Sequence, residues 1–191
     1  MMLEYVTIKR DFVPQHALDH LLKLTGAVAY PTTVGHGSGE SIDSEYRNTG
    51  RHRIPDETIL DIKGTIYGIH DEFLTAKHKS VLRSIEEPQL LSYGPGGKYD
   101  PHNDSEDFVD NKLTRVVARD WTMIWYLNDD YEGGKLDFCQ LGITFNPKAG
   151  DMIVFPSYFE FEHAVTPVTR GTRKCLVTWI ETEDRIYERT V

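Results

Sequence analysis

The sequence predicts a mainly β protein in which N-terminal helices pack on a C-terminal β-barrel or sandwich. Two observations support this fold class. Before about residue 89, long stretches place apolar residues at helical spacing. From residue 89 onward, short runs rich in β-branched and aromatic residues alternate with turns. Short strands at regular spacing are typical of a sandwich or a small barrel.

Two helices and one loop are expected in the N-terminal part. Residues 11–24 place leucines at helical spacing, behind Asp11 or Pro14, either of which can open a helix. Residues 33–53 are rich in glycine, serine and charge, which predicts a mobile loop. A second helix is expected around residues 56–83, with interruptions near Gly64 and Gly68.

Six runs after residue 88 are expected to form strands. Turns such as YGPGG, DDYEGG and PKAG separate them, and these turns are rich in the residues that favour chain reversal. In chain order the runs are QLLSY, DWTMIWYLN, KLDFCQL, GITFN, DMIVFPS and KCLVTWIET.

Length and composition narrow the class of protein. The 191 residues predict one domain, with a helical part over about 1–88 and a β core over about 89–182. A net charge of −9 argues against a nucleic-acid partner.

Cys139 and Cys175 are too few for a disulfide framework, and we expect both to be buried, reduced thiols. No signal peptide or membrane-length apolar run is present, so a cytoplasmic location without membrane contact is expected. The sequence does not predict the oligomeric state.

A histidine and a carboxylate lie two residues apart in the stretch YDPHND. If the backbone is extended, His102 and Asp104 point the same way, although such a stretch is also a common polar turn. His163 is the best third candidate because it follows a strand-like run, whereas an ordinary strand-end histidine is the alternative interpretation. Two histidines and one carboxylate form the facial triad of non-haem iron(II) oxygenases.

An arginine follows His163 by ten residues. Alternation along the last strand places Arg173 on the same face as Cys175, Val177 and Trp179. On a face that points into a barrel, the planar guanidinium requires an anion and suits a carboxylate. An exposed arginine at a strand end is the alternative.

Three segments together resemble the prolyl 4-hydroxylase type of 2-oxoglutarate/Fe(II) dioxygenase. They are LLSYGPGGKYDPHND, RDWTMIWYLNDDYEGGKLDF and NPKAGDMIVFPSYFEFEHAVTPVTRGTRKCLVTWI. The resemblance covers residues 89–180 and extends more weakly to the N-terminal helix. It implies a double-stranded β-helix core, also called a jelly-roll or cupin-like fold.

The resemblance also implies a role for individual residues. His102, Asp104 and His163 would bind iron and so form the catalytic centre, and Arg173 would bind the distal carboxylate of 2-oxoglutarate. Three residues are candidates for a hydroxyl partner of the co-substrate, with Tyr93 ahead of Thr122 and Tyr126. Tyr99 and Trp179 match positions that line the substrate entrance in relatives, although ordinary packing is their alternative role.

The activity that this resemblance implies is hydroxylation of an unactivated C–H bond, with a prolyl residue of a peptide or protein as the leading substrate. Fe(II), 2-oxoglutarate and O2 would take part, and ascorbate would serve as the reductant.

A free amino acid or other small molecule is an alternative substrate. Two further alternatives are a nucleic-acid dealkylase, against which the acidic charge counts, and a non-catalytic cupin-like binding module. Residues 105–121, with the 33–53 loop, would supply any lid.

Overall fold

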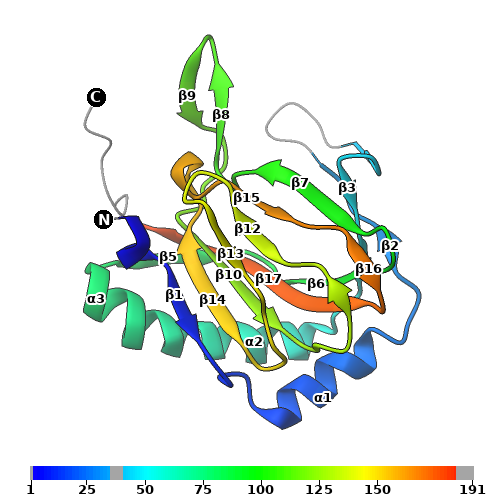
Figure 1. Ribbon diagram of the computed structural model, residues 1–191. Helices are drawn as coiled ribbons and strands as arrows, with labels where there is room; N and C mark the ends of the chain where they lie inside the picture. The colour runs from blue at the N-terminus through cyan, green and yellow to red at the C-terminus, as the bar shows by residue number, and fades with distance from the viewer. Residues whose placement is uncertain (1, 35–40, 184–191) are drawn as a thin grey trace.

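The computed structural model describes residues 2–34 and 41–183. Its longer helices lie along one side of a large sheet, and a hairpin projects from the opposite end of the molecule (Figure 1). The helical segments are the 3-10 turn Met2–Tyr5, α1 (Gln15–Leu24), α2 (Asp56–Ile69), a π-helical segment (His70–Thr75), α3 (Ala76–His78) and the 3-10 turn Phe159–Phe161.

Two antiparallel sheets of unequal size form the body of the described chain. The larger has eight strands in the order β1 (Thr7–Lys9), β14 (Met152–Pro156), β10 (Trp121–Tyr126), β17 (Arg173–Thr182), β6 (Gln89–Tyr93), β4 (Gly50–His52) and β2 (Tyr30–Pro31), with β5 (Leu82–Ile85) also paired to β17. The smaller has the order β13 (Ile143–Phe145), β12 (Leu136–Phe138), β15 (His163–Val165), β7 (Lys98–His102) and β3 (Arg47–Asn48).

Two short antiparallel pairs complete the strands of the described chain. They are β11 (Glu132–Gly133) with β16 (Val168–Arg170), and the projecting hairpin β8 (Glu106–Val109) with β9 (Lys112–Arg115). The mainly β fold with N-terminal helices is confirmed, and each of the six runs expected as strands contains one. The architecture is a jelly-roll, in which the two sheets face each other.

The large sheet separates two hydrophobic cores. Leu176 and Ile180 face the core that α1 and α2 cover, whereas Cys175, Val177 and Trp179 face the core between the sheets. The alternation expected along the last strand is therefore confirmed. Because every second side chain of β17 faces the smaller sheet, this strand can present Arg173 to the interior of the jelly-roll.

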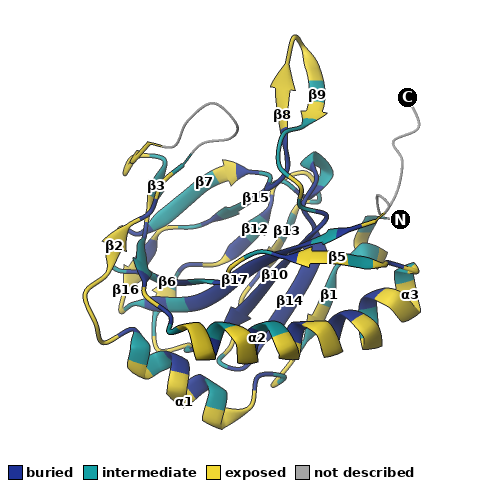
Figure 2. Cartoon of the chain, turned by 180° about the vertical axis from the view of Figure 1, so that it is seen from behind, coloured by how far each residue is buried: buried dark blue, intermediate teal, exposed yellow. Residues whose placement is uncertain are grey.

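The second helix differs from its prediction in two ways. α2 runs through Gly64 and Gly68 without a break, and the helical run changes to a π-helical segment only after Ile69. The run then ends with α3 at His78, before Lys79 adopts a left-handed conformation with φ 52°. Both glycines are exposed. α2 carries a buried stripe that includes Ile62 and Ile66, and Figure 2 shows this helix with alternating exposed and buried segments. Packing of this stripe outweighs the weak helix propensity of glycine.

The expected loop at residues 33–53 is also partly wrong. Residues 35–40 lie outside the described chain, but β3 and β4 occupy 47–48 and 50–52. Gly50 permits a close approach of two backbones, since a Cβ there would lie 2.7 Å from the Ala29 Cβ. His52 is buried and bonds through Nε2 to Ser92 Oγ at 2.9 Å. Gly50 therefore allows close packing of two segments, whereas the glycine-rich sequence suggested a mobile loop.

Two further expectations need correction. Cys139 is exposed, because its strand ends at Phe138 and the cysteine falls in the following turn, while Cys175 is buried as expected. The β8–β9 hairpin occupies the segment that the sequence leaves without structure. Its turn has Asp110 and Asn111 at φ 49° and 60°, and two such residues are a recognisable hairpin signal.

Candidate functional site

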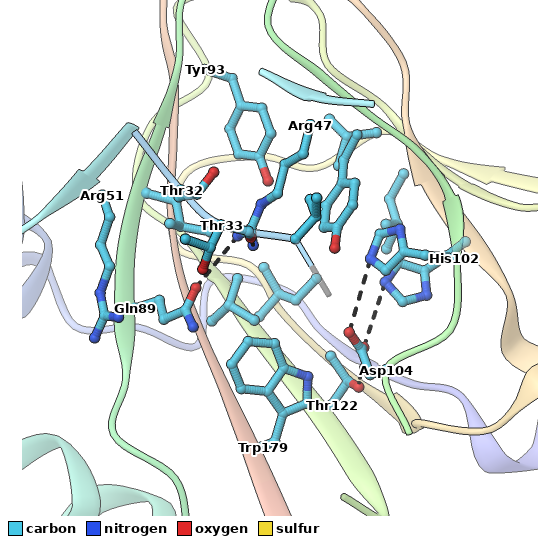
Figure 3. A pocket seen from close by; sticks show the side chains of 18 of the residues that line it. Thr32, Thr33, Arg47, Arg51, Gln89, Tyr93, His102, Asp104, Thr122 and Trp179 are labelled. Atoms are coloured by element: carbon cyan, nitrogen blue, oxygen red, sulfur yellow. Dashed lines mark hydrogen bonds and ion pairs between the residues drawn. The ribbon is translucent and has the colours of Figure 1, made fainter. Parts of the chain in front are cut away.

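A cavity of about 330 Å³ lies between the two sheets. Its lining comes from strands of both sheets and from residues 31–34. In Figure 3, His102 and Asp104 lie on one side of this cavity, and Gln89 and Arg51 lie on the other. A concave, partly apolar space with a few converging polar groups is the usual form of a ligand site.

One end of the cavity gathers two histidines and a carboxylate. His102 ends β7 and His163 begins β15, and strand pairing places these residues opposite each other. Asp104 lies in a turn beyond β7, where the Asn103 side-chain oxygen accepts a hydrogen bond from the Ser105 N–H at 3.2 Å. This turn, in place of an extended backbone, directs Asp104 toward the histidines. One potential ligand atom from each of the three residues lies within 4.8 Å of the others.

Backbone contacts fix the histidine tautomers. His102 Nδ1 lies 2.8 Å from the Asp100 carbonyl oxygen, and His163 Nδ1 lies 3.0 Å from that of Phe161. Because a carbonyl oxygen only accepts hydrogen bonds, both Nδ1 atoms carry hydrogen, so Nε2 is the nitrogen of each ring that can offer a lone pair to a metal. These Nε2 atoms lie 3.9 and 3.6 Å from the Asp104 carboxylate. Three electron-pair donors without a hydrogen between them suit a metal cation.

The protonation states also suit a metal. Burial and the neighbouring His163 lower the pKa of His102 to about 3. Burial alone would raise the pKa of Asp104, but His163, His102 and Arg119 lower it to about 2. At neutral pH the site therefore holds a neutral imidazole at His102 and an ionised carboxylate, which are the forms that bind metal.

A hydroxyl chain holds the Asp104 carboxylate in place. Thr122 Oγ1 donates to Asp104 Oδ2 at 2.6 Å and lies 2.8 Å from Ser157 Oγ. Since the single Thr122 proton is given to Asp104, Ser157 donates to Thr122. Thr122, expected as a partner of the co-substrate, thus contacts a candidate metal ligand directly.

Arg173 is the second charged feature of the cavity. It is 1% exposed, and no carboxylate of the described residues pairs with it. Its NH1 lies 3.2 Å from Cys175 Sγ, while its Nε is buried without a hydrogen-bond partner. A Cβ at Gly134 would lie 2.9 Å from the Arg173 Cδ, so a glycine in the EGG turn makes room for the arginine. A buried, unpaired guanidinium fits a carboxylate ligand.

The tyrosines named from the sequence take different positions. Tyr93 lines the cavity and its ring centre lies 4.7 Å from the Arg173 guanidinium carbon. Tyr126 lies beside Arg173 at 5.1 Å, is fully buried, and does not belong to the cavity lining. Tyr99 stacks on His102 with ring centres 3.5 Å apart. Burial raises the pKa of Tyr99 well above its ordinary value, so its hydroxyl stays protonated.

Sequence reasoning missed three arginines that line the cavity, Arg47, Arg51 and Arg119. Two of them lie over aromatic rings of the cavity. Arg119 lies over the Trp179 ring at 3.7 Å and makes two hydrogen bonds to Glu86 at 2.6 and 2.8 Å. Arg47 lies over the Tyr99 ring at 4.6 Å. Arg47 falls in the stretch interpreted as a mobile loop, and Arg119 follows the unrecognised hairpin. Neither position carries a spacing signal, because strand pairing brings both to the cavity.

The jelly-roll, the His–Asp–His cluster and the buried arginine together define the non-haem iron(II) class of oxygenase site. Residues 88–181 match the family model described as "2OG-Fe(II) oxygenase superfamily". The chain belongs to this superfamily, and it is of the prolyl 4-hydroxylase type.

Relatives and solved structures agree with this assignment. The chain is 30% identical over 155 residues to a PKHD-type hydroxylase of Teredinibacter turnerae, covering 77% of this chain and 66% of that protein. A viral collagen prolyl hydroxylase from Paramecium Bursaria Chlorella virus-1, solved as a 2OG complex, is 25% identical with TM-score 0.70, over 92% of this chain and 95% of that one. A prolyl hydroxylase from Trichoplax adhaerens, 16% identical with TM-score 0.75 over 94% and 84% of the chains, shares the fold.

The chain spans about two thirds or less of the length of the first curated relatives that it matches. No helix of the described residues is long and apolar enough to cross a membrane.

Proposed function

We propose that this protein is an Fe(II)- and 2-oxoglutarate-dependent dioxygenase that hydroxylates an unactivated C–H bond, with a prolyl residue of a peptide or protein as substrate. One observation carries the proposal. The His102–Asp104–His163 cluster and the unpaired Arg173 line the same cavity, so a metal and a dicarboxylate would meet there.

Five residues that line the cavity receive a role. His102, Asp104 and His163 would hold Fe(II), and a set of three ligands leaves positions open for other groups. Arg173 would bind the distal carboxylate of 2-oxoglutarate from within the jelly-roll, with the hydroxyl of Tyr93 beside it. When bound, the iron would supply the oxidising chemistry: one oxygen atom of O2 would enter the succinate that forms with CO2 from 2-oxoglutarate, and the other would enter the substrate as a hydroxyl group. Burial of the three candidate ligands and of Arg173 would limit the access of water to the reacting groups.

A prolyl substrate is supported by the names of the relatives, several of which are prolyl hydroxylases. Tyr99 and Trp179 line the cavity and would contact the substrate. A free amino acid or another small molecule is the alternative substrate. A non-catalytic cupin-like module would not require both a set of three metal-ligating side chains and a buried arginine that binds a co-substrate.

Three further points belong to the proposal. Residues 1–191 would work as one domain, because α1 and α2 share a core with the large sheet. Ascorbate would keep the iron reduced between turnovers. A reducing, cytoplasmic location is consistent with two free thiols, at Cys139 and Cys175.

The proposal is tested by following succinate from Fe(II)-loaded protein with 2-oxoglutarate, ascorbate and a panel of prolyl peptides and amino acids. Wild type should form succinate. Arg173→Ala should raise the KM for 2-oxoglutarate at least about 30-fold, since breaking a buried charge pair costs roughly 2 kcal/mol or more. Its iron affinity should stay close to that of wild type.

Arg170→Ala is the matched control, because this arginine is exposed on β16 three residues away. Its KM for 2-oxoglutarate should equal that of wild type. No succinate with any compound of the panel would support the binding module, and unchanged kinetics of Arg173→Ala would remove the carboxylate role of Arg173.

A further inference from the structure

The cavity carries an excess of positive charge in an acidic protein. The chain has a net charge of −9, yet one carboxylate and four arginines line this cavity. The arginines are Arg47, Arg51, Arg119 and Arg173. A local positive potential of this kind attracts anions to one place on a molecule that repels them elsewhere.

Three of the four arginines have an ionic role. Arg173 faces the proposed co-substrate site, and Arg119 pairs with Glu86. Arg51 pairs with Glu87 at 3.1 Å. The fourth, Arg47, pairs with no carboxylate among the described residues, although it belongs to the same cavity.

Arg47 is held in position by neutral acceptors. Its NH1 donates to the Thr33 carbonyl oxygen at 3.0 Å, and its NH2 donates to Gln89 Oε1 at 3.4 Å. The Nε is buried and has no partner. Two neutral contacts therefore orient the guanidinium and leave N–H groups for an anion, which a carboxylate can bind in a two-point manner.

The position of Arg47 points to the substrate. Arg47 pairs with Tyr99 across β3 and β7, and its guanidinium carbon lies 4.6 Å over the Tyr99 ring. The Tyr99 ring also stacks on His102, so a single aromatic ring contacts both the guanidinium and a proposed iron ligand. Figure 3 places Arg47 between Gln89 on one side and His102 and Asp104 on the other, and Arg47 is half-exposed. A group that binds near the iron and extends outward would pass this arginine.

We propose that Arg47 binds a carboxylate of the substrate, and that the substrate is therefore an acidic prolyl peptide. The carboxylate comes from a Glu or Asp side chain near the proline or from the C-terminus of the peptide. This inference rests on the proposed function for the identity of the hydroxylated residue. It assigns to Arg47, on β3, a task separate from that of Arg173, which lies on β17.

Peptide binding without turnover tests this inference. The protein is loaded with Mn(II) and saturating 2-oxoglutarate under anaerobic conditions, and dissociation constants are measured by calorimetry for peptides of equal length. The set has Glu, Gln or Lys on either side of one proline with blocked ends, and a Gln peptide with a free C-terminal carboxylate. Wild type should bind a carboxylate-bearing peptide about 10-fold or more tighter than the blocked Gln peptide, the size expected for a charged hydrogen bond.

Substitutions assign the preference to Arg47. Arg47→Gln should bind acidic and neutral peptides alike, whereas Arg47→Lys should keep part of the preference because it keeps the charge. Arg83→Gln is the control, since it removes the same charge from an arginine on β5 that does not line the cavity. It should behave as wild type. Circular dichroism and the affinity for 2-oxoglutarate should be the same in all variants.

The binding results distinguish the two sources of the carboxylate and identify the outcomes that would overturn the role of Arg47. A preference for the Glu peptides assigns the carboxylate to a side chain, and a preference for the free end assigns it to the C-terminus. No carboxylate preference in wild type, or the same preference in Arg47→Gln, would overturn the inference. So would a loss of 2-oxoglutarate affinity in Arg47→Gln. Because no turnover is measured, an Arg47-dependent preference stands even where hydroxylation is not found.

Discussion

At the scale of single residues, the site depends on groups that orient the metal ligands. The backbone carbonyls of Asp100 and Phe161 fix the tautomers of the two histidines, and Thr122 fixes the carboxylate. The histidines and Asp104 could be chosen from the sequence because their types and order match a known chemistry. The role of Thr122 could not, since a threonine in a strand resembles any other buried threonine until its partner is known.

Thr122→Val tests this orienting role. Valine keeps the shape of threonine and removes the hydroxyl that bonds to Asp104 Oδ2 at 2.6 Å. We expect Mn(II) affinity to fall roughly 10- to 100-fold, the usual effect of losing a partner of a metal ligand. Thr122→Ser keeps the hydroxyl and should retain most of the affinity in a calorimetric titration. Equal affinities of the valine variant and wild type would show that Thr122 does not orient the ligand.

At the scale of elements, the helical layer stabilises the sheet that carries the site. Buried residues of α1 and α2 form one core with the outer face of the large sheet, and the inner face of that sheet lines the cavity. Periodicity predicted these helices, but their ends required the structure. The strands β3 and β4 could not be predicted, because strands of only two and three residues take their conformation from the strands they pair with, β7 and β6.

Ile66→Ala measures how much α2 contributes to stability. Ile66 is 0% exposed within this core, so its truncation should lower the free energy of unfolding by about 2–5 kcal/mol. Leu60→Ala is the matched control on the same helix, because Leu60 is 69% exposed and should cost less than about 0.5 kcal/mol. Urea denaturation followed by circular dichroism gives both values. Similar losses for the two variants would mean that α2 does not pack as described.

At the scale of the whole molecule, the fold brings together residues that are distant in sequence. His163 lies about sixty residues after His102, yet the pairing of β15 with β7 places them opposite each other. Strand spacing was sufficient to predict a β-barrel or sandwich, and the resemblance to a known family added the jelly-roll and its principal charged groups. Neither was sufficient for Arg47 and Arg119, because a side chain reaches this cavity through strand pairing and hairpin geometry that leave no spacing pattern.

Under the proposed function, His102, Asp104 and His163 hold Fe(II) in the folded chain. A ligand that binds only the folded state raises the free energy of unfolding by about 2.7 kcal/mol at a concentration 100 times its Kd. Anaerobic thermal denaturation with and without Fe(II) measures this gain directly. Fe(II) should raise the midpoint of wild type and of the exposed-histidine control His16→Ala, and should leave the midpoint of His163→Ala unchanged. An equal increase in wild type and His163→Ala would contradict this assignment.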